Sequence, residues 1–196
     1  EAGQSLGLNE NVGPYALTVV FFAVGATIVS AFLRPDPLVL IGGLDSATSP
    51  KRASFGESMR IMMSRPMARL ALVSLVISQA VMVGVMAMTP LHMDEHGHDV
   101  GVIGLVISAH TAGMFAFAPL AGWFADRFGK VPSIAIGGLI LVLATTMTAL
   151  AGEAPKLLMF PGLYLLGLGW SFGMVAGSAL LTESVEMEDR VSVQGA

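Results

Sequence analysis

GWFADRFGK, at residues 122–130, is the stretch of this chain that decides its fold class. The run before it, residues 100–125, contains no Asp, Glu, Lys or Arg, and three charged residues then arrive within five positions. Among them stands Gly129, which can take a positive φ angle and close a tight turn without a Cβ clash. A long apolar run that ends in such a turn is typical of a membrane helix that meets the cytoplasm.

The composition also indicates a membrane protein. Hydrophobic residues make up 54% of the 196 residues, and charged residues make up only 12%. The mean hydropathy is +0.75, whereas an average soluble domain carries about 25% charged residues. Several stretches lack charge and reach the roughly 20 residues that cross a bilayer as a helix. These five stretches are residues 11–33, 70–93, 100–125, 131–152 and 157–182.

Backbone chemistry favours helices for all of these stretches. In lipid, every backbone N–H and C=O group must be paired within the segment or within a closed barrel. Barrel strands would be shorter and would alternate polar with apolar residues, which these runs do not. We therefore predict an all-α integral membrane fold with five transmembrane helices, kinked near Pro119 and Pro161.

The basic residues predict the orientation of the helices. Nine of the ten Lys and Arg residues fall on one side of the membrane, and only Lys156 falls on the other. By the positive-inside rule, the side with nine is the cytoplasm. We expect a multi-pass protein of the cell membrane with an external N-terminus and a cytoplasmic C-terminus. The nine residues are Arg34, Lys51, Arg52, Arg60, Arg65, Arg69, Arg127, Lys130 and Arg190.

This topology divides the chain into four parts. They are an external segment with the first helix (1–33), a cytoplasmic connection (34–69), four further helices (70–182) and a cytoplasmic loop (183–196).

The cytoplasmic connection contains its own helix signal. Ser54 and Glu57 form a capping box, which satisfies free N–H groups at a helix start. The apolar residues expected near one face of this helix are Phe55, Met59, Met62 and Met63. Pro66 interrupts the pattern. We predict a short amphipathic helix on the inner membrane surface; a solvated linker is the alternative.

The pattern G-x-x-x-D-R-x-G-[RK] is completed here by Gly122, Asp126, Arg127, Gly129 and Lys130. It resembles the loop signature of the major facilitator superfamily of transporters. In that family a long cytoplasmic loop joins helices six and seven, and the signature follows helix two and, in a weaker copy, helix eight.

The resemblance sets the register of the spans. The charged turn lies two spans after the long connection, so the five spans resemble helices six to ten of a partial major-facilitator bundle. Helices one to five, eleven and twelve of the same transporter would lie outside this sequence. The sequence does not begin with Met, which agrees with a start inside a longer protein.

The resemblance implies secondary active transport of a small solute by alternating access, without a cofactor. In the family, contacts of the charged turn latch the cytoplasmic gate. The alternative is that Arg127 and Lys130 only set the topology. A proton is the expected coupling ion. The spans hold no Lys, Arg, Asp or Glu and are rich in Met, Phe, Leu and Val. This composition favours an apolar or amphipathic solute, as in drug-efflux antiporters.

Five residues inside the spans are candidates for a solute or proton pathway. His110 lies near the middle of the third span, where ionisable groups are costly and tend to face a wet cavity. Imidazole also titrates near neutral pH. Thr111 is its neighbour, Ser78 and Gln79 lie in the second span, and Trp170 lies in the fifth. Helix packing is the alternative role for these polar side chains.

Small and acidic residues mark the fifth span and its inner end. Gly169, Gly173 and Gly177 stand four apart, a spacing that lets two helix backbones approach closely. We expect packing, with helix sliding during transport as the alternative. Beyond them, Glu183 and Asp189 lie in an acidic stretch. We favour a solvated loop there over a salt bridge to the basic turns.

The external connection at residues 92–99 holds three histidines and three carboxylates. Such groups bind metals, but His96 and His98 cannot share a helix face, so we expect a solvated turn and no metal site. The chain has no P-loop, zincin, nucleophile-elbow or dinucleotide fingerprint. We expect neither catalysis nor a nucleic-acid partner. A membrane-embedded enzyme and a non-transporting sensor or scaffold are the competing interpretations.

Overall fold

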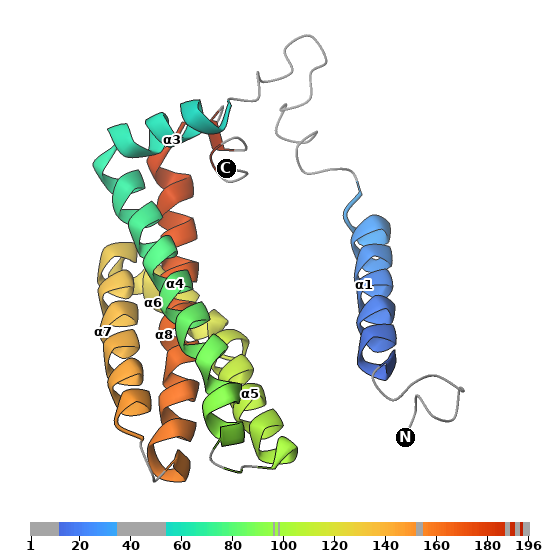
Figure 1. Cartoon of the computed structure of the whole chain (residues 1–196). Helices are drawn as coiled ribbons and strands as arrows, with labels where there is room; N and C mark the ends of the chain where they lie inside the picture. The colour runs from blue at the N-terminus through green and yellow to red at the C-terminus, as the bar shows by residue number, and fades with distance from the viewer. Residues whose placement is uncertain are drawn as a thin grey trace. The chain divides into compact units, whose positions relative to one another are not determined.

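The computed structural model describes residues 12–34, 54–95, 97, 99–151, 155–186, 189–190 and 193. Within these ranges the chain is helical and contains no strand, which confirms the all-α prediction (Figure 1). The helices are α1 (Val12–Phe32), α3 (Phe55–Ser64), α4 (Pro66–Glu95), α5 (Val100–Phe115), α6 (Ala118–Phe128), α7 (Lys130–Ala149) and α8 (Pro155–Ser184).

Five helical stretches are long and apolar enough to cross a membrane, as predicted. They are Tyr15–Phe32, Pro66–Glu95, Val100–Phe128, Lys130–Ala149 and Leu158–Ser184.

The helix α1 belongs to a separate unit, residues 1–51, and is described by itself. Every side chain described from residue 15 to residue 34 is exposed, and the helix is apolar on all sides. A helix that is hydrophobic all round suits a membrane span and not a water-exposed surface.

The helix boundaries differ from those expected from charge alone. The second span was expected at residues 70–93, but α4 runs from Pro66 to Glu95. The third was expected as one helix ending at residue 125. It is interrupted at Ala116 and Phe117, and Pro119 lies in the first turn of α6. Charged residues mark where an apolar run meets water, and a helix can continue beyond that point because its backbone bonds do not depend on apolar side chains.

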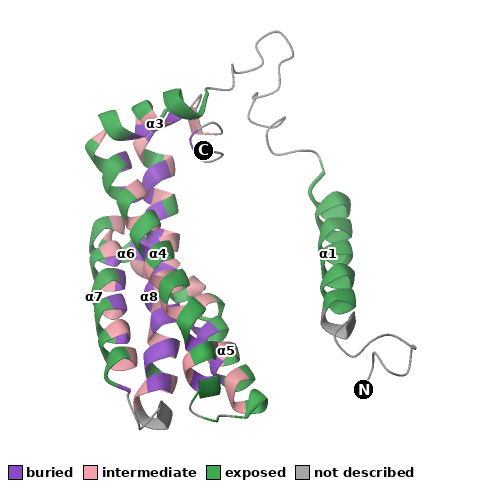
Figure 2. Ribbon diagram, in the orientation of Figure 1, coloured by how far each residue is buried: buried purple, intermediate pink, exposed green. Residues whose placement is uncertain are grey.

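The remaining helices pack around α8 in the unit that spans residues 52–196. The helices α4, α5, α6 and α7 all contact α8, and buried residues concentrate on α8 in Figure 2. Of its apolar window, 56% is buried, compared with 11–22% for the spans formed by α4 to α7. The helix α8 is therefore the core element of this unit.

Glycines allow the close approach of neighbouring helices to α8. A Cβ atom at Gly113 of α5 would overlap the carbonyl oxygen of Tyr164, and one at Gly167 of α8 would overlap that of His110.

The predicted row of glycines in α8, Gly169, Gly173 and Gly177, meets two other helices. A Cβ atom at Gly169 would lie 3.0 Å from the carbonyl oxygen of Gly137 in α7. One at Gly173 would overlap Ser78 Oγ, and one at Gly177 would lie 3.0 Å from Leu75 Cδ2; both of these contacts are to α4.

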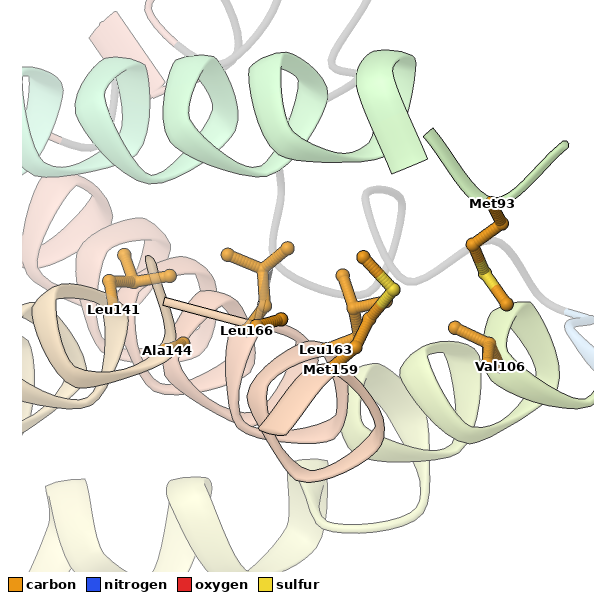
Figure 3. Packing of buried hydrophobic residues seen from close by; sticks show 8 residues of the cluster. Met93, Val106, Leu141, Ala144, Met159, Leu163 and Leu166 are labelled. Atoms are coloured by element: carbon orange, nitrogen blue, oxygen red, sulfur yellow. The ribbon is translucent and has the colours of Figure 1, made fainter. Parts of the chain in front are cut away.

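Two apolar clusters complete the packing. Figure 3 shows one cluster, in which side chains of α4, α5 and α7 meet α8. It consists of Met93, Val106, Leu141, Ala144, Ala151, Met159, Leu163 and Leu166. The second cluster brings α3 and the start of α4 against the end of α8. It consists of Met62, Ala68, Ala71, Leu180, Leu181, Val185 and Val193.

The predicted amphipathic helix is present as α3. Ser54 is its N-cap, and the Ser54 hydroxyl accepts a hydrogen bond from the Glu57 backbone N–H at 3.4 Å. Met62 and Ser58 are buried, whereas Phe55 and Met63 are exposed. One side of α3 therefore packs on protein, and the other side presents large apolar residues outward.

We predict that Gly167→Ala destabilises the bundle by roughly 1–3 kcal/mol, because the new methyl group would overlap backbone and force α5 away from α8. Thermal unfolding of the detergent-solubilised protein measures this change. Gly138→Ala is the matched control, since a Cβ atom at Gly138 has no neighbour within 4 Å. Equal melting temperatures for the two variants would contradict the prediction.

Candidate functional site

The charged turn joins α6 to α7 through a single residue, Gly129. Its φ angle is 100° and its ψ angle is 156°, a conformation that strongly favours glycine. The Gly129 N–H donates to the Ala125 carbonyl at 3.0 Å, and the Gly129 carbonyl accepts from the Ser133 N–H at 3.3 Å. This one residue therefore ends α6, starts α7 and sets the position of Lys130.

An ion pair connects the charged turn to the end of α8. Lys130 is the first residue of α7, and its Nζ atom lies 2.8 Å from Oε1 of Glu183. Glu183 is in the last turn of α8. The solvated loop favoured from sequence is thus wrong for Glu183, because the strong packing of α7 on α8 brings the two charges together. For Asp189, no ion pair is present within the described residues.

A second cation holds the same end of α8. Arg65, between α3 and α4, donates to the Ser184 carbonyl at 3.2 Å and to Glu186 Oε1 at 2.6 Å. A cation beside the C-terminal carbonyls of a helix also complements the helix dipole. In the sequence, Arg65 stands out only as one of the basic residues that predict the topology. Its separation of 121 residues from Glu186 leaves no local pattern that could reveal the contact.

Asp126 and Arg127 lie in the last turn of α6, not beyond the helix end as expected, because α6 continues to Phe128. Both side chains are exposed, and neither forms an ion pair with another described residue. Gly122 faces α8, where a Cβ atom would lie 3.9 Å from Val175 Cγ1.

His110 is buried in the contact between α5 and α8, with only 3% of the residue exposed. Its Nδ1 atom lies 3.0 Å from the Leu163 carbonyl oxygen. A carbonyl can only accept, so Nδ1–H donates. The Nε2 atom is also buried and has no hydrogen-bond partner among the described residues. Thr111 is exposed, and its hydroxyl donates to the Ile107 carbonyl at 2.9 Å.

Adjacent residues of α4 have different surroundings. Ser78 is buried against Gly173 in the contact between α4 and α8. Gln79 is exposed, and its Oε1 atom accepts a hydrogen bond from Trp170 Nε1 at 3.0 Å. The Trp170 ring packs edge-on with Phe115, with 6.1 Å between centroids and 72° between planes. Gln79 and Trp170 are thus linked by a hydrogen bond, and Ser78 takes no part in that contact.

The described residues include no group of three His, Cys, Asp or Glu side chains that could hold a metal ion. His96 and His98, from the external histidine stretch, lie outside the described residues.

Comparison with known proteins identifies the family of this chain. Residues 6–196 match the Major Facilitator Superfamily. Two uncharacterized MFS-type transporters of Bacillus subtilis (strain 168) are similar: YdeG is 33% identical over 192 residues, and YddS is 32% identical over 197 residues. The alignments cover 97% and 100% of the chain but 45% of each relative. The chain thus spans about half the length of these relatives.

A riboflavin transporter, RfnT of Brucella anthropi, is 36% identical over 121 residues, which are 62% of this chain and 30% of that relative. No solved structure shows a significant match. The family is one of transporters, so the competing interpretation of a membrane-embedded enzyme is wrong. With a match over nearly its whole length, five apolar helices and the charged turn between α6 and α7, the chain belongs to the major facilitator superfamily.

Proposed function

We propose that the protein carrying this chain moves a small solute across the cell membrane by alternating access, and that the chain supplies helices six to ten. The observation that carries the proposal is the pair of cationic contacts that hold the end of α8, from Lys130 and from Arg65. Alternating access requires contacts that are formed in one state and released in another.

The chemistry of the two ion pairs suits a contact that opens and closes. The side chains are partly exposed: 24% for Lys130 and 58% for Glu183, and 37% for Arg65 and 73% for Glu186. Exposed ion pairs contribute little net stability, because water solvates the separated charges well. Their loss therefore costs little, and a modest difference in solute binding can shift the equilibrium between states.

The solute is proposed to be neutral or amphipathic. The spans α4, α5 and α8 carry no Asp, Glu, Lys or Arg at mid-length. The relative RfnT is a riboflavin transporter, so riboflavin is a reasonable first test solute. Export in exchange for protons, as in drug-efflux antiporters, is one form that the transport can take.

Proton coupling is proposed to involve His110. The supporting observation is the buried Nε2 atom, which has no hydrogen-bond partner among the described residues. Such an atom can accept a proton when a conformational change admits water. The opposing interpretation assigns His110 to packing, through its hydrogen bond to Leu163.

The proposed topology places α3 in the cytoplasm and the turn between α7 and α8 outside. We predict that a membrane-impermeant maleimide labels Leu150→Cys but not Phe55→Cys in intact cells. Both side chains are well exposed, at 70% and 64%, and this chain has no native cysteine. The reverse labelling pattern would show that the orientation is wrong.

Charge reversal tests the contact between α7 and α8. We expect Lys130→Glu and Glu183→Lys each to change the initial rate of riboflavin uptake into proteoliposomes by about fivefold or more, and the double variant to recover most of it. Arg60→Glu on α3 is the control for charge reversal alone.

Hydrogen exchange at the ends of α7 and α8 gives a second measurement that needs no transported solute. Exchange should rise in each single variant and return toward the wild-type level in the double variant. Unchanged riboflavin uptake and unchanged hydrogen exchange in the single variants would show that the charged turn only sets the topology.

The role of His110 is tested with His110→Gln, which retains hydrogen bonding but removes the titration. We predict that transport by this variant loses the pH dependence of the wild type, while its melting temperature stays close to that of the wild type. A wild-type pH profile would assign His110 to packing.

A further inference from the structure

Gln79, Trp170 and Phe115 form a cluster at mid-length of the spans. Gln79 and Trp170 lie near the middle of α4 and α8, and Phe115 is the last residue of α5, directly before the helix break at Ala116 and Phe117. Substrate sites of secondary transporters lie near the bilayer midplane, beside interrupted helices. Non-helical backbone at that depth is tolerated where it lines a cavity or is covered by protein.

The hydrogen bond between Trp170 and Gln79 determines what the cluster can bind. The indole Nε1–H group can only donate, so the Gln79 amide must turn its oxygen toward Trp170. The amide nitrogen of Gln79 then points its two N–H groups elsewhere, and no described residue accepts from them. Gln79 is exposed. The cluster therefore offers two N–H donors that are unpaired within the described part of the chain, while one of the two lone pairs of its amide oxygen is used by Trp170.

The rings of Phe115 and Trp170 add apolar surface, in two different planes, next to these donors. Phe115 is 61% exposed, and its ring stands at 72° to that of Trp170. Two aromatic rings at this angle offer an edge and a face to a third ring. The helices that carry the cluster have no Asp, Glu, Lys or Arg near it, so a charged ligand would find no permanently charged counter-ion there.

We propose that these three residues recognise the transported solute, and that the solute is a neutral, planar, conjugated molecule with a carbonyl acceptor. The carbonyl accepts from the Gln79 amide N–H groups, and the conjugated ring packs on Trp170 and Phe115. The inference rests on the proposed transport function and specifies the solute class of that function.

Binding of lumichrome, a planar fluorescent tricycle with ring carbonyls, tests the inference. Fluorescence anisotropy measures its affinity for the full-length protein in lipid nanodiscs, with empty nanodiscs as the blank. We expect 2-naphthamide to compete. Naphthalene lacks the acceptor and cyclohexanecarboxamide lacks the planar ring, so neither should compete at the same concentration.

The variants separate the two kinds of contact. Gln79→Glu keeps the acceptor for Trp170 but replaces the donors with a carboxylate, and we expect lumichrome affinity to fall about tenfold or more. Trp170→Phe keeps a ring but frees the Gln79 amide to turn, and we expect a loss of about threefold. Trp123→Phe, the same substitution at a 57% exposed site on α6, should leave the affinity unchanged.

Each outcome decides the question. No lumichrome binding to the wild type, or equal competition by all three competitors, would overturn the inference. So would wild-type affinity in Gln79→Glu. A fall in melting temperature without a fall in affinity would make the cluster a packing contact. Transport of another solute in proteoliposomes would then still support the proposed function, and absence of any transport would count against that function itself.

Discussion

The arrangement of the bundle depends on how closely three helices approach α8. Glycines stand at the contacts with α5, α7 and α4, and in two of these contacts a single methyl group would overlap a backbone oxygen or a side-chain hydroxyl. In lipid there is little hydrophobic force between helices, so close van der Waals packing must hold them together. The ion pairs and the buried imidazole occupy their positions because this packing brings α7 and α5 against α8.

Sequence patterns identified the elements and missed much of what joins them. The spans and α3 could be predicted because apolar length and capping are local properties. The interruption of the third span was foreseen only as a kink at Pro119. The contact of Arg65 with the end of α8 could not be predicted, because it depends on the packing of α3 and α4 on α8. Neighbours such as Ser78 and Gln79 looked equivalent, and only the face that α4 turns to α8 separates them.

Two kinds of hydrogen bond stand out among the polar side chains of the described spans. Hydroxyl groups such as those of Thr89, Ser108 and Thr145 donate to carbonyls three or four residues earlier in their own helix. These local bonds satisfy the hydroxyls within one helix and carry no information about neighbours. The bonds from His110 to Leu163 and from Trp170 to Gln79 cross between helices. The residues whose hydrogen bonds cross between helices are therefore the ones that couple the position of one helix to that of another.

The central place of α8 has a consequence for biogenesis. Among the described helices of this unit, α8 follows α4, α5, α6 and α7 along the chain, so the ribosome delivers those four helices to the translocon before the helix on which they pack exists. During that interval, groups such as the His110 imidazole face lipid, water or an insertase without their final neighbour. The contacts of α4, α5, α6 and α7 with α8 can thus form only after α8 enters the membrane, and quality-control factors meet these four helices without that partner until then.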